Sequence, residues 1–141
     1  AGGETEFTRW GWSNFLQNRC VDIAQPEVCA LGGISEYLKV LAIAHTNFIP
    51  VINHVWGSAI ALATNLQLLA AMPPVPGSLH PNEPWLEFDT TDNKFRDDLL
   101  TKPLKIQEQV KNNNGFVDIP DGPGIGVEPD KEYIKNFILN F

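Results

Sequence analysis

Four polar residues, Glu4, Glu27, His54 and Glu87, each follow a short apolar run, and these runs recur at a nearly constant interval. The gaps between the four residues are 23, 27 and 33 positions. A barrel of about 250 residues with eight strand–helix units uses roughly 31 residues per unit. The spacing therefore predicts that one strand–helix unit separates each polar residue from the next. Because the carboxyl ends of neighbouring strands form the active site of such barrels, we expect the four side chains to face one pocket.

The segments between these residues have the patterns of alternating helices and strands. Apolar residues recur every three or four positions in three segments, which is typical of helices that bury one face. Three short apolar runs are typical of buried strands, and the alternation predicts a parallel sheet with right-handed crossovers. The expected order is helix 8–19, strand 21–25, helix 35–46, strand 48–53, helix 58–72 and strand 85–88.

The last third of the chain departs from this alternation. Residues 104–109 and 116–119 are predicted as two strands of a β-hairpin, because the turn-forming residues 111–115 lie between them. Asp130 is expected to cap a final helix. This tail is therefore expected to pack across the barrel or onto another domain.

The composition excludes several classes of protein. A chain of 141 residues that is 43% hydrophobic and 19% charged is globular rather than disordered. The net charge of -7 argues against a general nucleic-acid binder, which needs a basic face. The apolar stretch 59–72 is interrupted by Thr64, Asn65 and Gln67, so no membrane span is expected. Two cysteines without metal-binding spacing, and no signal peptide, predict a cytoplasmic protein with reduced thiols.

His54 is the leading candidate for proton transfer. A histidine that ends a buried strand presents its ring at the mouth of the predicted pocket, and its ordinary pKa of about 6.5 suits a general base or acid. A histidine buried for structural reasons is the alternative interpretation. Glu27 ends the neighbouring strand, where a carboxylate can accept the ring N–H, set the tautomer and orient the imidazole.

Glu4 and Glu87 are the other acidic candidates. The carboxylate of Glu4 suits a hard cation such as Mg²⁺, which prefers oxygen ligands, although one carboxylate alone does not make a metal site. A solvated glutamate is the alternative for Glu4, and Glu6 is a nearby competitor. Partial burial of Glu87 behind an apolar Trp–Leu pair would favour its protonated form, which can donate to a developing oxyanion. A structural ion pair is the alternative for Glu87.

Five motifs follow one another along nearly the whole chain. They are Gly2-Gly3-Glu4, Gln25-Pro26-Glu27-Val28 with Gly32-Gly33, Ile52-Asn53-His54-Val55-Trp56-Gly57, Trp85-Leu86-Glu87-Phe88-Asp89 and Ile119-Pro120-Asp121-Gly122-Pro123-Gly124-Ile125-Gly126-Val127. This set, in this order, resembles the enolase superfamily in its mandelate racemase and muconate-lactonizing branch. The stretches around His54 and Glu87 particularly resemble the sugar-acid cycloisomerases of that branch.

The resemblance implies a more detailed fold. Residues 1–96 would form the second half of a TIM-type (β/α)7β barrel in an α/β protein. Residues 97–141 would form a C-terminal segment, with the β-hairpin and the helix, that packs on the barrel or on a capping domain. The barrel's N-terminal half and the capping domain have no counterpart in this chain, so we expect it to be a fragment of a longer protein.

The resemblance also implies roles for the four residues. Glu4 would be the third magnesium ligand, Glu27 and His54 would form a dyad with His54 as general base or acid, and Glu87 would stabilise the enolate. The family abstracts the proton alpha to a carboxylate, which here implies a sugar-acid cycloisomerase, dehydratase or racemase. Most relatives carry an aspartate where this chain has Glu27, and the further Mg²⁺ ligands and the lysine acid/base are absent from it.

Half a barrel leaves a sheet edge and apolar helix faces uncovered. We therefore expect the chain to be inactive alone, and to pair with the missing half or form a homo-oligomer. Two alternatives remain open at this point. One is a non-catalytic binding or assembly module that retains the half-barrel geometry. The other is an unrelated metal-dependent hydrolase that uses Glu4 or Glu6 with His80.

Overall fold

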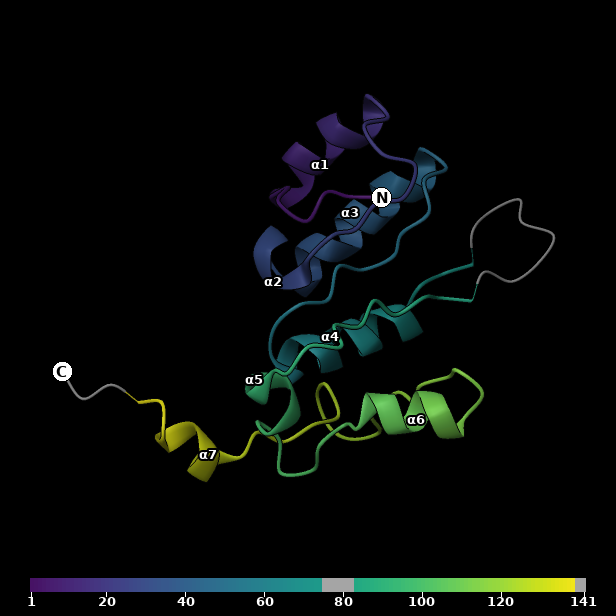
Figure 1. Cartoon of the computed structure of the whole chain (residues 1–141). Coiled ribbons are helices and arrows are strands. Elements are labelled where there is room, and N and C mark those ends of the chain that lie inside the picture. Colours follow the sequence, from purple (N-terminus) through teal and green to yellow (C-terminus); the bar gives the residue numbers. More distant parts are fainter. Residues whose placement is uncertain (75–82, 139–141) are drawn as a thin grey trace. The chain divides into compact units, whose positions relative to one another are not determined.

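The computed structural model describes residues 1–74 and 83–138, and these ranges contain seven α-helices (Figure 1). The chain divides into two compact units: Ala1–Val55 with Leu68–Asp89, which we call unit 1, and Trp56–Gln67 with Thr90–Phe141, which we call unit 2. The helices are α1 (Thr8–Gln17), α2 (Val28–Leu31), α3 (Ile34–Thr46), α4 (Ala59–Ala70), α5 (Lys94–Asp97), α6 (Ile106–Asn112) and α7 (Lys131–Lys135).

Extended segments of unit 1 lie parallel at two of the three predicted strands, 21–25 and 48–53, whereas residues 85–88 make no β-bridge within the described ranges. Isolated parallel bridges join Gly2 to Ala24 and Ala24 to Val51. The backbone N–H of His54 donates to the carbonyl of Pro26 over 3.1 Å, so the pairing continues to the ends of two of these segments. Within the described ranges these are single bridges rather than longer strands, but the parallel direction is as predicted. Parallel neighbours bring their carboxyl ends to one edge.

The core of unit 1 lies between these segments and two helices. Helix α1 packs against α3, and the two lie side by side (Figure 1). Trp12 of α1 is completely buried, and its indole N–H donates to the backbone carbonyl of Glu6 over 3.1 Å. Gly3 has a φ of +108°, and a Cβ there would lie 2.3 Å from the indole ring of Trp12, so only glycine fits. The buried residues that α1 and α3 contribute to this core are Trp12, Leu16, Tyr37, Val40, Leu41 and Ala44.

Glu36 joins α1 to α3 through its carboxylate. Its Oε1 accepts the backbone N–H of Arg9 over 2.9 Å, and its Oε2 lies 3.2 Å from the Lys39 ammonium. The hydrogen bond from the Arg9 backbone, followed by the nearby positive charges, holds the pKa of Glu36 below its ordinary value. A carboxylate whose pKa is lowered by folding stabilises the folded state above its unfolded pKa, and this contribution disappears as the pH falls through the folded pKa.

We therefore expect Glu36→Gln to lower the stability of the protein at pH 7, with a difference from the wild type that shrinks below pH 4.5 and disappears in stronger acid. Urea denaturation at pH 7 and at pH 3 measures this difference. Glu132→Gln is the matched control, because the Glu132 side chain is 80% exposed and bonds only to Lys135 in the described ranges. An equal effect of the two substitutions at pH 7 would contradict the role assigned to Glu36.

Unit 2 has a smaller core around Ala59, Leu99 and Leu100. An antiparallel bridge joins Leu100 to Pro129. Asp130 caps α7, as the sequence predicts: its Oδ1 accepts the backbone N–H groups of the second and third helical residues over 2.9 and 3.1 Å.

The predicted β-hairpin is wrong in its first strand, because residues 106–112 form helix α6. Ile106 is buried at the start of this helix, and the Gln109 amide donates back to the carbonyl of Leu104 over 2.7 Å. The same side chain accepts the backbone N–H of Asp118 over 2.8 Å. Gln, Glu and Lys, which fill much of this segment, favour helix over strand. The strand was predicted from the turn-forming residues 111–115, and the helix propensity of the segment, with the Gln109 contacts, outweighs that signal.

None of the helices in residues 1–74 and 83–138 combines the length and apolar character needed to cross a membrane. The cytoplasmic location stays a prediction. His80 lies outside the described residues, so the hydrolase alternative that depends on it is not tested.

Candidate active site

Three of the four predicted site residues lie together in unit 1. The His54 Nδ1 atom lies 3.1 and 3.3 Å from the two carboxylate oxygens of Glu87. The nearest oxygen of Glu4 is 3.6 Å from the same nitrogen. The His54 side chain is 21% exposed, Glu87 35% and Glu4 59%, so the imidazole is the most enclosed member and the carboxylates lie nearer to solvent. The imidazole and two of the three predicted carboxylates therefore lie close together, as the spacing predicts.

Gln25 is a fourth member of this group, and sequence reasoning gave it no role. Its side-chain Nε2 donates to Glu87 Oε2 over 3.0 Å. We call Glu4, Gln25, His54 and Glu87 the polar cluster. Side chains alternate between two faces along extended chain, so Gln25 shares a face with the position two residues later, where Glu27 was singled out. That alternation is the signal that would have identified Gln25.

The residue before His54 fixes the orientation of this segment. Asn53 is completely buried and accepts a hydrogen bond from the hydroxyl of Tyr37 in α3. Burial raises the pKa of Tyr37 well above its ordinary value, so the phenol remains a donor at neutral pH. Because consecutive side chains point to opposite faces, anchoring Asn53 toward α3 directs His54 to the other face.

Glu27 makes a different contact. Its side chain is 8% exposed and caps α2, where Oε1 accepts the backbone N–H of Cys29 over 2.9 Å. Its Oε2 is buried and has no hydrogen-bond partner within residues 1–74 and 83–138. The chain leaves its extended path after Pro26 and enters α2 at Val28, which turns Glu27 into a cap. The pairing of Glu27 with His54 stays a prediction.

The thiol of Cys29 reports on the charge of Glu27. Both cysteines are free and exposed. Partial burial, followed by the Glu27 charge and its hydrogen bond, raises the pKa of the Cys29 thiol. We expect Glu27→Gln to lower this pKa and to accelerate alkylation of Cys29 by iodoacetamide several-fold at neutral pH, since only the thiolate reacts. Peptide mass spectrometry measures the rate, Cys20 is the internal control, and an unchanged ratio of the two rates would refute the coupling.

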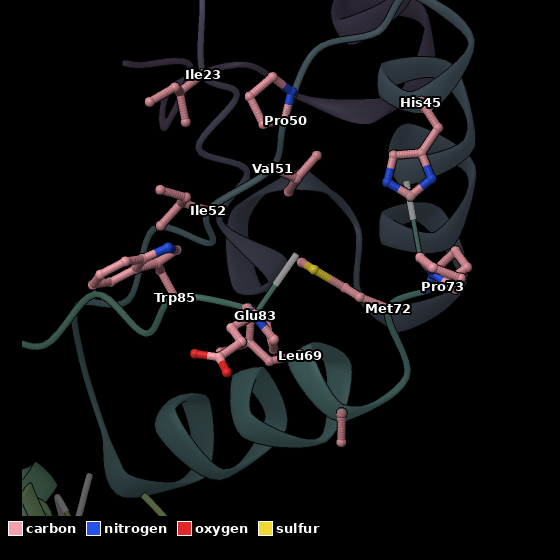
Figure 2. A pocket seen from close by; sticks show the side chains of 13 residues that line it. Ile23, His45, Pro50, Val51, Ile52, Leu69, Met72, Pro73, Glu83 and Trp85 are labelled. Atoms are coloured by element: carbon pink, nitrogen blue, oxygen red, sulfur yellow. The ribbon is translucent and has the colours of Figure 1, made fainter. Parts of the chain in front are cut away.

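A hollow of about 790 Å³ lies in unit 1 (Figure 2). Ile23, Ile52 and Trp85 line it, and each lies two positions before a member of the polar cluster. Residues two apart on an extended segment share a face, so these apolar side chains form the next layer along the same face. Layers of side chains contributed by neighbouring strands are typical of the interior of an α/β barrel.

The polar cluster fits a magnesium ion only in part. Glu4 offers hard oxygen ligands, which Mg²⁺ prefers. Across the described residues, no three His, Cys, Asp or Glu side chains lie close enough together to hold a metal ion. An ion bound here would therefore need ligands beyond this group.

Comparison with known proteins identifies the family to which this chain is similar and the enzymes that are its relatives. The family described as "Enolase C-terminal domain-like" matches residues 1–133. D-galactarolactone cycloisomerase of Agrobacterium fabrum is 42% identical over 97% of this chain and 35% of its own length. Arabinonate dehydratase of Saccharolobus solfataricus is 35% identical over 89% of this chain and 30% of its own length. The chain thus spans about a third of the curated relatives it matches.

Solved structures of similar fold support the same family. The crystal structure of 3,6-anhydro-D-galactonate cycloisomerase from Zobellia galactanivorans superposes with a TM-score of 0.81 and 31% identity. The match covers 99% of this chain and 35% of that one. These findings confirm the resemblance read from the five motifs, and they support the α/β assignment.

Proposed function

Because this chain belongs to the enolase C-terminal domain-like family, and with it to the enolase superfamily, we propose that it forms part of a sugar-acid active site. The proposed reaction is abstraction of the proton alpha to the substrate carboxylate, which would begin a cycloisomerisation, a dehydration or a racemisation. Its relatives are sugar-acid cycloisomerases and dehydratases, which supports this general kind of reaction.

One observation carries the proposal: the His54 imidazole lies against Glu87, close to Glu4, at the ends of parallel segments. In the proposed reaction His54 removes the alpha proton and the electron pair of the broken C–H bond enters the enolate. Histidine is the side chain that most often serves as a general base in proteins. The roles that the resemblance gives to Glu27, as partner of His54, and to Glu87, as stabiliser of the enolate, remain predictions.

We propose that Glu4 supplies one of several carboxylate ligands to Mg²⁺, with the others outside the described residues. When bound, the ion stabilises negative charge on the substrate's carboxylate oxygens, as is known for this superfamily. The enclosed imidazole of His54 suits proton transfer, and the more exposed carboxylate of Glu4 suits metal binding.

A chimera tests the function directly. Residues 1–133 would replace the matching segment of the Agrobacterium cycloisomerase, which supplies the remaining two thirds of a complete chain. In D₂O with Mg²⁺, NMR would follow deuterium incorporation alpha to the carboxylate of galactarate and arabinonate. We expect exchange by the chimera, and no measurable exchange by the 141-residue chain alone.

Two outcomes would count against the proposal. A folded chimera without exchange would favour the alternative, a binding or assembly module that retains the geometry without the chemistry. Metal-dependent exchange by the chain alone would contradict the claim that the site needs further groups.

We also propose that unit 1 associates with further protein, either the rest of a barrel or another copy of this chain. Large apolar side chains of unit 1 remain open to solvent, among them Phe7 at 59%, Phe48 at 72% and Trp85 at 72% exposure. Exposed apolar surface of this kind favours association. Sedimentation velocity over a hundredfold range of concentration is expected to show self-association, and a monomer at every concentration would argue against it.

A further inference from the structure

We propose that Gln25 is a positioning residue, whose side-chain amide holds the Glu87 carboxylate in place at the proposed active site. The resemblance implies roles for the other three members of the polar cluster but none for Gln25. The inference rests on the proposed function for its catalytic meaning, because the place of Glu87 affects the reaction only if that carboxylate contributes to it. Every contact that supports the inference lies within unit 1.

Gln25 lies on an extended segment that is paired on both sides. On one side its backbone N–H donates to the carbonyl of Gly2 over 2.8 Å. On the other side the backbone N–H of Ile52 donates to the carbonyl of Ala24 over 3.0 Å. The two parallel bridges of unit 1 also meet at Ala24. The backbone that carries the Gln25 side chain is therefore fixed by two neighbouring segments.

The side chain of Gln25 points away from the helical core of unit 1. Ala24, the residue before it, is completely buried in that core. Because successive side chains on an extended segment point to opposite faces, Gln25 points to the other face, where the polar cluster lies. There its Nε2 donates to Glu87 Oε2 over 3.0 Å, although the two residues are 62 positions apart in the sequence.

The segment that carries Glu87 lacks the backbone pairing of the Gln25 segment. Residues 85–88 make no β-bridge within the described ranges. The Glu87 side chain is 35% exposed, so a carboxylate without a partner there could change rotamer freely. The hydrogen bond from Gln25 therefore links Glu87 to a segment whose own position is fixed on both sides.

The chemistry of an amide suits this positioning role. The NH₂ group of glutamine donates hydrogen bonds and carries no charge, so Gln25 orients the carboxylate without adding charge to the site. Two substitutions of similar size remove the donor. Leucine has no hydrogen-bonding group, and an ionised glutamate can only accept and would repel Glu87.

Nuclear magnetic resonance of the 141-residue chain tests the contact without substrate or metal. The Gln25 side-chain amide is assigned in ¹H–¹⁵N spectra by its loss in Gln25→Leu. An N–H that donates to a carboxylate resonates downfield, so we expect one Gln25 amide proton to shift upfield in Glu87→Leu. The exposed Gln17, which bonds to Ser13 within α1, is the internal control and should not shift.

Unchanged Gln25 signals in Glu87→Leu would overturn the proposal. Backbone amide spectra verify that each variant is folded. Glu87→Ala, which also removes both acceptor oxygens, provides the same test if Glu87→Leu does not fold.

Exchange kinetics of the chimera test the consequence for the reaction. We expect Gln25→Leu and Gln25→Glu to lower kcat about tenfold, because a ~1 Å displacement of a group at the reacting centre costs up to ~10²-fold. KM should stay within about twofold, since substrate binding is not the step affected. Gln17→Leu, the same chemical change on an exposed helix face, should alter neither constant. A kcat within about twofold of the parent in both Gln25 variants would overturn the proposal, as would an equal loss in Gln17→Leu.

The two measurements separate this inference from the proposed function. If the parent chimera shows no exchange, the proposed function fails, and the amide spectra still decide whether Gln25 holds Glu87. If the chimera exchanges the alpha proton while both Gln25 variants keep its kcat, the proposed function survives and this inference is wrong.

Discussion

Replacing His54 with asparagine is expected to reduce alpha-proton exchange by the chimera about 10³-fold, in the middle of the range that general acid–base catalysis contributes. That loss corresponds to about 4 kcal/mol of transition-state stabilisation. Asparagine retains a polar side chain but has no group that accepts a proton near neutral pH. Because the side chain is 21% exposed rather than part of the apolar core, we expect the fold to tolerate the change.

His45→Asn is the matched control for this prediction. His45 lies in the last turn of α3, one residue before the helix ends at Thr46, and it lines the hollow (Figure 2). The same chemical change there should leave the exchange rate within about twofold of the parent chimera, because surface substitutions usually perturb a structure little. Equal losses in the two variants would indicate damage to the fold, and full activity of His54→Asn would exclude His54 as the base.

Replacing Trp12 with alanine is expected to destabilise the protein by about 3–5 kcal/mol, because truncating a fully buried tryptophan leaves a large cavity. The indole packs edge-on against Phe15, with ring centroids 5.7 Å apart, and its N–H bonds to the Glu6 carbonyl. Domains of this size have a total stability of about 5–15 kcal/mol, so the variant will lose much of its folded population at modest denaturant concentration.

Trp10→Ala, two residues earlier in α1, is the control. The Trp10 side chain is 69% exposed and its main contact is the Arg9 guanidinium, 4.5 Å from the ring centroid. An exposed cation–π contact contributes about 0.5–1 kcal/mol. Urea denaturation followed by far-UV circular dichroism measures both variants. A loss for Trp12→Ala no larger than that for Trp10→Ala would contradict the packing described for unit 1.

The parallel arrangement was predictable because hydrophobic periodicity is local. The apolar runs that precede Glu27 and His54 are short, and the helices between them show their buried face in the spacing of their own side chains. Such patterns require no knowledge of distant contacts. The observed bridges from Gly2 to Ala24 and from Ala24 to Val51 follow the predicted order.

Segment 104–112 was not predictable from the same rule. Residues 104–109 were predicted as a strand because turn-forming residues follow them, yet residues 106–112 form a helix, and Ile106 and Val110 lie four positions apart, as on one helix face. Its stability depends on the Gln109 contacts with Leu104 and with Asp118, nine residues away. Short apolar patterns are ambiguous between helix and strand, and here helix propensity and these contacts together favour the helix.

The sequence by itself determined which residues are candidates for chemistry and the interval at which they recur, because residue type and periodicity are properties of the chain alone. Only the tertiary structure decided which acid contacts His54. Glu27 and Glu87 are equivalent in the pattern, but the start of α2 draws Glu27 into a cap, while Gln25 holds Glu87 against the imidazole. Whether a hydrogen bond forms depends on differences of a few tenths of an ångström in the distance between donor and acceptor. For atoms far apart in the sequence, that distance is set only when the segments pack together.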